Sequence, residues 1–337
     1  MVIASFKQYI PGLFILLTIG IAGRFIADKI PGLNYLILSI LIGLIIGNTI
    51  GTPDWAQHGT ETHKLWLESG IVLMGASIAF DQVVEAGLRI LLFIVLISSL
   101  TIIVLELLTR TFFNISEEVG SLLAAGSSIC GVSAIVAVAG AIRARQDQIA
   151  YAAATVLIFD ALTIFAYPLL GRVLGLSDVA FGIWAGTTMF STGPVAAAGF
   201  AFSDTAGQWA VLVKLSRNAL IGGAVIMYSF YYMQRNQSQS FRDALSIRSL
   251  KSTFPKFVIG FFGMMIVANS GILSDEQILS FENISNWMFL LAFAGLGLEI
   301  RIKTLRNTGL KPILLVFFSL VIVSTTSLML ITVLFGV

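Results

Sequence analysis

Small polar residues form a block within a long apolar stretch at 119 to 141. The block runs from Gly126 to Ser133, and its polar members are Ser127, Ser128, Cys130 and Ser133. Glycine lets a helix open, and an opened helix N-terminus attracts anions through unpaired N–H groups and the helix dipole. The block therefore predicts an oxyanion site that needs no formal positive charge. The alternative is that these small residues only allow close helix packing.

A second block of the same composition lies in the stretch at 180 to 203. It runs from Gly186 to Pro194, and its polar members are Thr187, Thr188, Ser191 and Thr192. Thr188, Ser191 and Thr192 share one helical face at spacings of three and four, so together they could line a cavity. The alternative is a proline kink whose freed carbonyls are satisfied by neighbouring hydroxyls.

Two cations and one carboxylate also fall within apolar stretches. Lys214 and Arg217 share one face of 207 to 233, where an uncompensated charge at the bilayer centre costs at least ~2.5 kcal/mol. They are candidates for neutralising an anion, unless they lie near the interface and snorkel. Asp160 lies near the centre of 149 to 174. We expect it to be protonated or paired, either as a proton-coupling group or as the counter-ion of Lys214 or Arg217.

The elements that must position these residues are membrane-spanning helices. Of the 337 residues, 57% are hydrophobic and 11% are charged, against about 25% charged in a soluble domain. We predict an all-α fold of 10 to 11 transmembrane segments in a single domain over 1–337, with a retained first helix and no cleavable signal peptide. The eleven stretches are 11–27, 34–50, 65–80, 87–109, 119–141, 149–174, 180–203, 207–233, 255–272, 285–300 and 310–336.

The distribution of basic residues indicates that one segment does not cross. The linker 234–256 and the loop 301–311 are basic and therefore cytoplasmic. Arg143 and Arg145 fall on the opposite side if every segment crosses, so either one crossing between 148 and 234 fails or the charge rule does. The segment 180–203 is the best candidate, and we expect a broken or re-entrant helix there.

Two internal echoes favour a structural repeat. The run from Gly70 to Ile78 resembles Leu290 to Leu298, and Ala125 to Ile129 resembles Ala185 to Met189. Duplicated halves with broken helices are a common plan of secondary transporters. The alternative is that small apolar residues repeat by chance in membrane helices, and the symmetry of a duplication stays open.

Other chemistry finds little support. His58 and His63 lie in a polar loop without a carboxylate cluster or cysteine nearby, which does not favour a metal site. Cys130 is the single cysteine, with no histidine at its depth, and fits packing better than nucleophilic catalysis. We find no protease, hydrolase or ATPase motif. The expectation is no metal, no cofactor, no enzymatic activity and, at a net charge of +2, no nucleic-acid partner.

Four sets of residues resemble the YeiH family of putative sulfate exporters. They are Gly126 to Gly131 with its alanine-rich continuation, Gly295 to Leu298, Gly70 to Gly75, and Val213 to Arg217. The resemblance implies a multi-helix inner-membrane carrier of the broad bile acid and arsenite transporter type. The chain departs from the family pattern at Phe190, Ser191 and Pro194, where the family carries a His-Glu pair and a later glutamine. It also has Ser77 in place of an arginine and Asp160 in place of a glycine, which suggests altered substrate or ion coupling.

The expected function is secondary active transport of a small anionic solute, such as sulfate or an organic sulfonate or carboxylate, in the cell inner membrane. Proton or sodium coupling both stay open, and the expected partners are the solute and membrane lipid, with a homodimer compatible with the sequence. The alternatives are an intramembrane enzyme and a passive channel or sensor.

Overall fold

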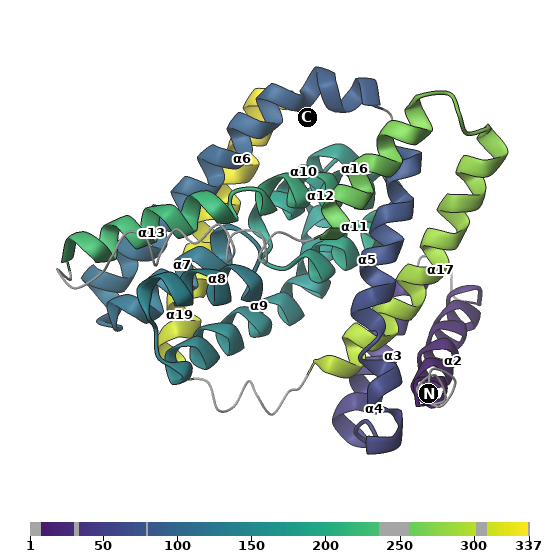
Figure 1. Ribbon diagram of the computed structural model, residues 1–337, viewed down its shortest axis with the longest axis horizontal. Helices are drawn as coiled ribbons and strands as arrows, with labels where there is room; N and C mark the ends of the chain where they lie inside the picture. Colours follow the sequence, from purple (N-terminus) through teal and green to yellow (C-terminus); the bar gives the residue numbers. More distant parts are fainter. Residues whose placement is uncertain (1–7, 30–33, 79, 236–255, 301–308, 336–337) are drawn as a thin grey trace. The chain divides into compact units, whose positions relative to one another are not determined.

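The computed structural model describes residues 8–29, 34–78, 80–235, 256–300 and 309–335, and all its elements are helical (Figure 1). Most of the basic linker 234–256 and of the loop 301–311 lies outside the described residues. The chain groups into two compact units, Met1–Ala86 with Lys256–Ile302 and Gly87–Pro255 with Lys303–Val337. The expectation of a single domain over 1–337 stays a prediction.

Five helices in the described part of the chain are long and apolar enough to cross a membrane. They are Ile10–Ala27, Gly87–Phe113, Gln146–Val173, Asp204–Gln234 and Leu310–Leu334. Four further apolar helices have 10 to 17 residues. The described residues are therefore helical and include helices long and apolar enough to span a membrane, whereas the count of 10 to 11 spans stays a prediction.

The first unit is built on closely packed helices. Its elements are α2 (Ile10–Ala27), α3 (Tyr35–Thr49), α4 (Asp54–Thr60), α5 (His63–Met74), the short η1 (Gly75–Ser77), α16 (Lys256–Asn269) and α17 (Asp275–Glu299). Gly43 and Gly47 of α3 lie against the backbone of α17, and Gly12 of α2 lies against Gly59 of α4. Small residues allow this approach where lipid offers no hydrophobic driving force between helices.

A buried histidine joins two helices of the first unit. His63 is 6% exposed; its Nδ1 lies 2.9 Å from the Thr60 carbonyl and its Nε2 lies 3.0 Å from Glu299 at the end of α17. Lys64 donates to the other Glu299 oxygen at 2.9 Å. The carboxylate at a helix C-terminus is unfavourable by itself, so these neighbours offset it and tie α5 to α17.

The second unit carries the sequence blocks. Its elements are most of α6 (Phe80–Leu108) with a π turn (Thr109–Phe113), α7 (Glu117–Ser128), α8 (Val132–Ile142), α9 (Gln146–Val173), α10 (Asp178–Thr188), α11 (Thr192–Phe202), α12 (Asp204–Asn218), α13 (Ile221–Arg235) and α19 (Leu310–Phe335). Both expected helix breaks are present, between α7 and α8 and between α10 and α11.

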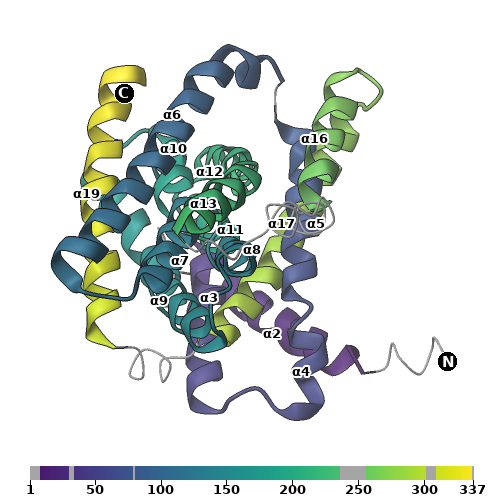
Figure 2. The ribbon, with the colours of Figure 1, turned by 60° about the vertical axis from the view of Figure 1, so that its left-hand side comes forward.

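The segment containing α7 and α8 folds back on itself (Figures 1 and 2). Gly126 of α7 packs against Ile135 of α8, although nine residues of straight helix would separate them by about 13 Å. The Gln148 amide, just after the hairpin, donates to Glu118 at its start at 3.4 Å. The stretch 119–141, expected to be a membrane segment, is therefore a re-entrant hairpin, hairpin 1, with its tip at residues 129–131. Gly131 supports the reversal because its φ is +67°.

The segment containing α10 and α11 also reverses, as expected for 180–203. Phe181 near its start stacks on Phe202 at its end, with ring centroids 4.1 Å apart. Its tip at residues 189–191 reaches the far end of α12, where the Asn218 amide donates to Thr192 at 3.4 Å. We call this segment hairpin 2.

The two hairpins enter from opposite ends of α9. The base of hairpin 1 meets Gln148 near the start of α9, whereas Gly171 near its end lies against Phe181 and Phe202 at the base of hairpin 2. With 28 residues, α9 is about 42 Å long, enough to span a bilayer.

This arrangement also accounts for the basic residues of the second unit. From the base of hairpin 2, α12 and α13 run back to the base of hairpin 1, where the hydroxyls of Tyr232 and Ser121 lie 3.1 Å apart. Arg143, Arg145 and the end of α13 at Arg235 consequently share one face, which removes the conflict with the positive-inside rule.

Candidate functional site

The tips of the two hairpins meet beside Lys214. A Cβ added at Gly131 would lie against Ser191 Oγ, so the tips touch. Lys214 is fully buried, and its Nζ donates to the carbonyls of Ile129 at 2.6 Å and Met189 at 3.0 Å. Ile129 and Met189 are equivalent positions of the second sequence echo. The ammonium group therefore lies between matching carbonyls of two hairpins.

Arg217, one turn further along α12, binds the same two helix ends. It is fully buried. Its guanidinium donates to the carbonyls of Ser127, Ser128 at 2.5 Å, Gly186 at 3.2 Å and Met189 at 2.7 Å. The last carbonyls of α7 and α10 have no partner within their own helices and form the negative end of each helix dipole. Both cations thus donate to carbonyls at helix C-termini that lack partners within their helices, and neither side chain extends to a membrane interface.

Asp160 lies at a helix N-terminus of the same region. Its Oδ1 accepts a hydrogen bond from the Ser191 amide, the N-cap of α11, at 3.0 Å. The residue is 3% exposed, and its Oδ2 has no hydrogen-bond partner. No ion pair within 4.0 Å joins Asp160 to Lys214 or Arg217, all three of which are described. The carboxylate therefore balances the positive end of α11 instead of pairing directly with a cation.

The predicted hydroxyl residues divide into two groups. Ser128, Thr187 and Thr188 donate to carbonyls of their own helices at 3.3, 2.7 and 2.6 Å, so these donors are engaged. The remaining group contains Ser127, which is buried without a partner for its hydroxyl, Ser133, which is exposed in the first turn of α8, the half-buried Ser191 and Thr192, and the buried Cys130.

Unpaired buried polar atoms gather around the hairpin tips. Four such side-chain atoms occur in the described part of the chain, and three of them belong to Ser127, Asp160 and Asn218. A buried group without a partner costs about 1–3 kcal/mol, so three together indicate a place for water, a proton or a solute. Asn218 was missed from the sequence, although it follows Arg217 near the middle of the stretch 207–233, where a polar side chain at membrane depth is the signal that could have identified it.

The charges at the tips do not cancel. Two helix C-termini and two helix N-termini meet here, so the helix dipoles offset each other, while two buried cations face one buried carboxylate. No carboxylate meets the first turn of α8 among the described contacts. The site therefore has one positive charge in excess while Lys214 is protonated and Asp160 is ionised.

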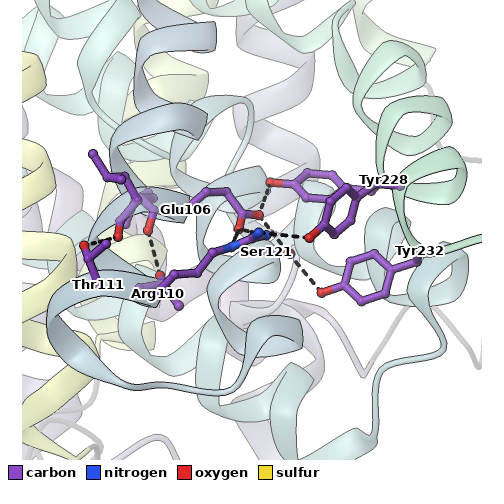
Figure 3. Close-up of polar contacts among 10 residues, drawn as sticks. Glu106, Arg110, Thr111, Ser121, Tyr228 and Tyr232 are labelled. Atoms are coloured by element: carbon purple, nitrogen blue, oxygen red, sulfur yellow. Dashed lines mark hydrogen bonds and ion pairs between the residues drawn. The ribbon is translucent and has the colours of Figure 1, made fainter. Parts of the chain in front are cut away.

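A second polar cluster, also missed from the sequence, holds hairpin 1 at its base (Figure 3). Glu106 of α6 accepts from Ser121 of α7 at 2.7 Å, from Tyr228 of α13 at 3.0 Å and from Arg110 at 2.8 Å. Tyr232 completes it through Ser121. Every side chain has a partner, so the Glu106 cluster joins three helices as a brace.

These features define a helical integral membrane protein with two opposed re-entrant hairpins. Residues 11–316 match the family model described as Conserved hypothetical protein 698, and the chain belongs to this family. The resemblance to the YeiH family is consistent with that assignment.

The relatives are membrane proteins of similar length. A UPF0324 membrane protein of Nitratidesulfovibrio vulgaris is 33% identical over 92% of this chain and 89% of its own length. Relatives bearing the same family name in Streptococcus agalactiae and Clostridium tetani are 31% and 28% identical, over 95% and 91% of this chain and 97% and 92% of their own lengths. No solved structure matches the chain.

Proposed function

We propose that the protein is a secondary active transporter of a small anionic solute in the bacterial inner membrane. The observation that carries the proposal is the meeting of two opposed hairpin tips beside the middle of α9, around unpaired buried polar atoms. Non-helical backbone at membrane depth is tolerated where it is buried in protein or lines a cavity, and discontinuous helices hold substrate near the midplane in secondary transporters.

The excess positive charge favours an anion as the solute. Lys214 and Arg217 are held away from lipid and are wholly desolvated, which strengthens their field in the site. Donors for the anion are the Ser127 and Ser133 hydroxyls and the amides of the first turn of α8. Sulfate, sulfonates and carboxylates have the acceptor oxygens that such donors bind.

Proton coupling follows from the charge balance. With Asp160 ionised, a solute with one negative charge balances the excess positive charge at the hairpin tips. With Asp160 protonated, a solute with two negative charges balances it. Proton binding also weakens the hydrogen bond from the Ser191 amide, because a neutral carboxyl is a poorer acceptor. A dianion and a proton would therefore bind together, which is the thermodynamic requirement for coupled movement.

The test is counterflow in proteoliposomes that contain the purified protein. Vesicles loaded with unlabelled solute should accumulate radiolabelled solute transiently and saturably, first for sulfate and then for a panel of sulfonates and carboxylates. A channel or a sensor shows no such overshoot. The double variant Ser128→Ala with Thr188→Ala and, separately, Ser127→Ala should distinguish helix-bonded from unpaired hydroxyls, with the exposed Lys311→Ala as control. Full-rate counterflow by every hydroxyl variant would reject the hydroxyl site, and no overshoot for any solute would reject the carrier.

A further inference from the structure

The position of Lys214 resembles that of a bound metal ion. Its Nζ lies between the carbonyls of Ile129 and Met189, which belong to different hairpins and to matching positions of the echo. Carbonyls at unwound helix ends are the groups that coordinate Na⁺ in transporters with discontinuous helices. Here an amine of the chain takes that place.

The Arg217 guanidinium also binds carbonyls at the two hairpin tips. It donates to four carbonyls of the same helix ends, and Met189 accepts from both cations. The C-terminal ends of α7 and α10 are therefore neutralised by groups that cannot leave. At these ends the carbonyls of Ser127, Ser128, Ile129, Gly186 and Met189 already accept hydrogen bonds from the two side chains.

We propose that Lys214 is a tethered cation that fills a monovalent-cation site formed by the two hairpin tips. Two consequences follow. The intact protein needs no Na⁺ to hold the tips together, and removing the Lys214 side chain creates a site for a free monovalent cation. The first consequence, applied to transport, rests on the proposed function and narrows the coupling ion from proton or sodium to the proton. The second is independent of transport.

Removal of the Lys214 side chain would leave two carbonyl oxygens placed to bind a small cation. Nζ–oxygen distances of 2.6 and 3.0 Å are those of a hydrogen-bonded ammonium group. Lys214→Ala leaves both carbonyls buried, and it removes the charge that offsets two helix C-termini. Free ammonium restores the donors, whereas Na⁺ or K⁺ restores the charge and accepts the carbonyl oxygens as ligands.

The experiment measures thermal unfolding of purified protein in chloride salts at constant ionic strength. Wild type should unfold at the same temperature in choline, Na⁺, K⁺ and ammonium. Lys214→Ala should unfold at a lower temperature in choline, and Na⁺, K⁺ or ammonium should raise it by about 3 °C or more through binding to the folded state alone. Lys311→Ala, at an exposed lysine of α19, controls for the loss of a positive charge. Lys214→Ser serves as a second variant.

Each outcome of the unfolding measurements either supports or overturns the proposal about Lys214. A response to small cations in a Lys214 variant but not in wild type or Lys311→Ala supports the proposal, as does recovery of folded Lys214→Ala only when ammonium or Na⁺ is supplied. Stabilisation of wild type by Na⁺ overturns it. Folded Lys214 variants without any cation response overturn it, and so does failure of both variants to fold in every salt. None of these readings depends on solute flux, so a failed counterflow assay would reject the carrier and leave this result standing.

Discussion

The carboxylate of Asp160 accepts a hydrogen bond of 3.0 Å from the amide of Ser191. This contact ties the middle of α9 to the tip of hairpin 2 and uses one of two carboxylate oxygens; the other is buried without a partner. The arrangement is that of a group which can take up a proton without breaking the fold.

For Asp160→Asn we expect a folded protein that has lost proton coupling. The asparagine oxygen still accepts from the Ser191 amide, but the side chain no longer changes charge. Counterflow at equal pH should persist, whereas accumulation driven by an imposed pH gradient should vanish. Asp147→Asn, at an exposed carboxylate near the start of α9, is the matched control. Gradient-driven accumulation at the wild-type level in Asp160→Asn would contradict this role.

Arg217→Leu should be strongly destabilising. The change leaves buried carbonyls of both hairpins without donors, and a single such group costs about 1–3 kcal/mol. Arg217→Lys should be intermediate, because it retains the charge but loses the planar set of five donors. The unfolding temperature of purified protein measures the order, with the neighbouring Ser216→Ala as control. Equal stability of Arg217→Leu and Ser216→Ala would show that the carbonyls have other partners.

Gly131→Ala should separate the hairpin tips. A residue other than glycine at φ +67° and ψ −131° costs about 1–3 kcal/mol, and the added methyl group would meet Ser191 Oγ. We expect a lower unfolding temperature and loss of counterflow. Gly140→Ala is the control, because nothing lies within 4 Å of its Cβ position and alanine favours the helix. If both variants behave alike, the tips are not in contact.

The Glu106 cluster predicts graded effects at the base of hairpin 1. Glu106→Ala leaves Tyr228 without its acceptor, Ser121 with Tyr232 alone and Arg110 with Tyr231 alone, which should cost about 2–3 kcal/mol. Glu106→Gln retains an acceptor and should cost less. Hydrogen exchange should rise in α7 and α13 together in Glu106→Ala. Faster exchange confined to α6 would mean that the cluster does not brace hairpin 1.

Much of the local structure could be predicted from residue types. Glycine and hydroxyl blocks at 126–133 and 186–194 identified both helix breaks, because few other residues tolerate an open backbone at membrane depth. Counting basic loops identified 180–203 as a segment that does not cross. The second sequence echo aligned Ile129 with Met189, and the carbonyls of both residues accept hydrogen bonds from Lys214.

Long-range pairings were beyond the sequence. Nothing local distinguishes a broken helix that continues from one that reverses, so 119–141 was expected to be a membrane segment. Lys214 and Arg217 were expected to face a solute or a partner, whereas they bind carbonyls, because backbone acceptors leave no signal in a sequence. His63 and Glu299 are 236 positions apart, and only the packing of α5 on α17 brings them together.

The structure predicts that both hairpins return to the face from which they enter, on opposite sides of the membrane. Single-cysteine variants on a Cys130→Ser background test it with a membrane-impermeant thiol reagent applied to vesicles of known orientation. Glu118→Cys and Arg145→Cys at the base of hairpin 1 should be labelled from one face, and Asp178→Cys and Asp204→Cys at the base of hairpin 2 from the other. Labelling of positions 118 and 145 from different faces, or of 178 and 204 from different faces, would contradict the account.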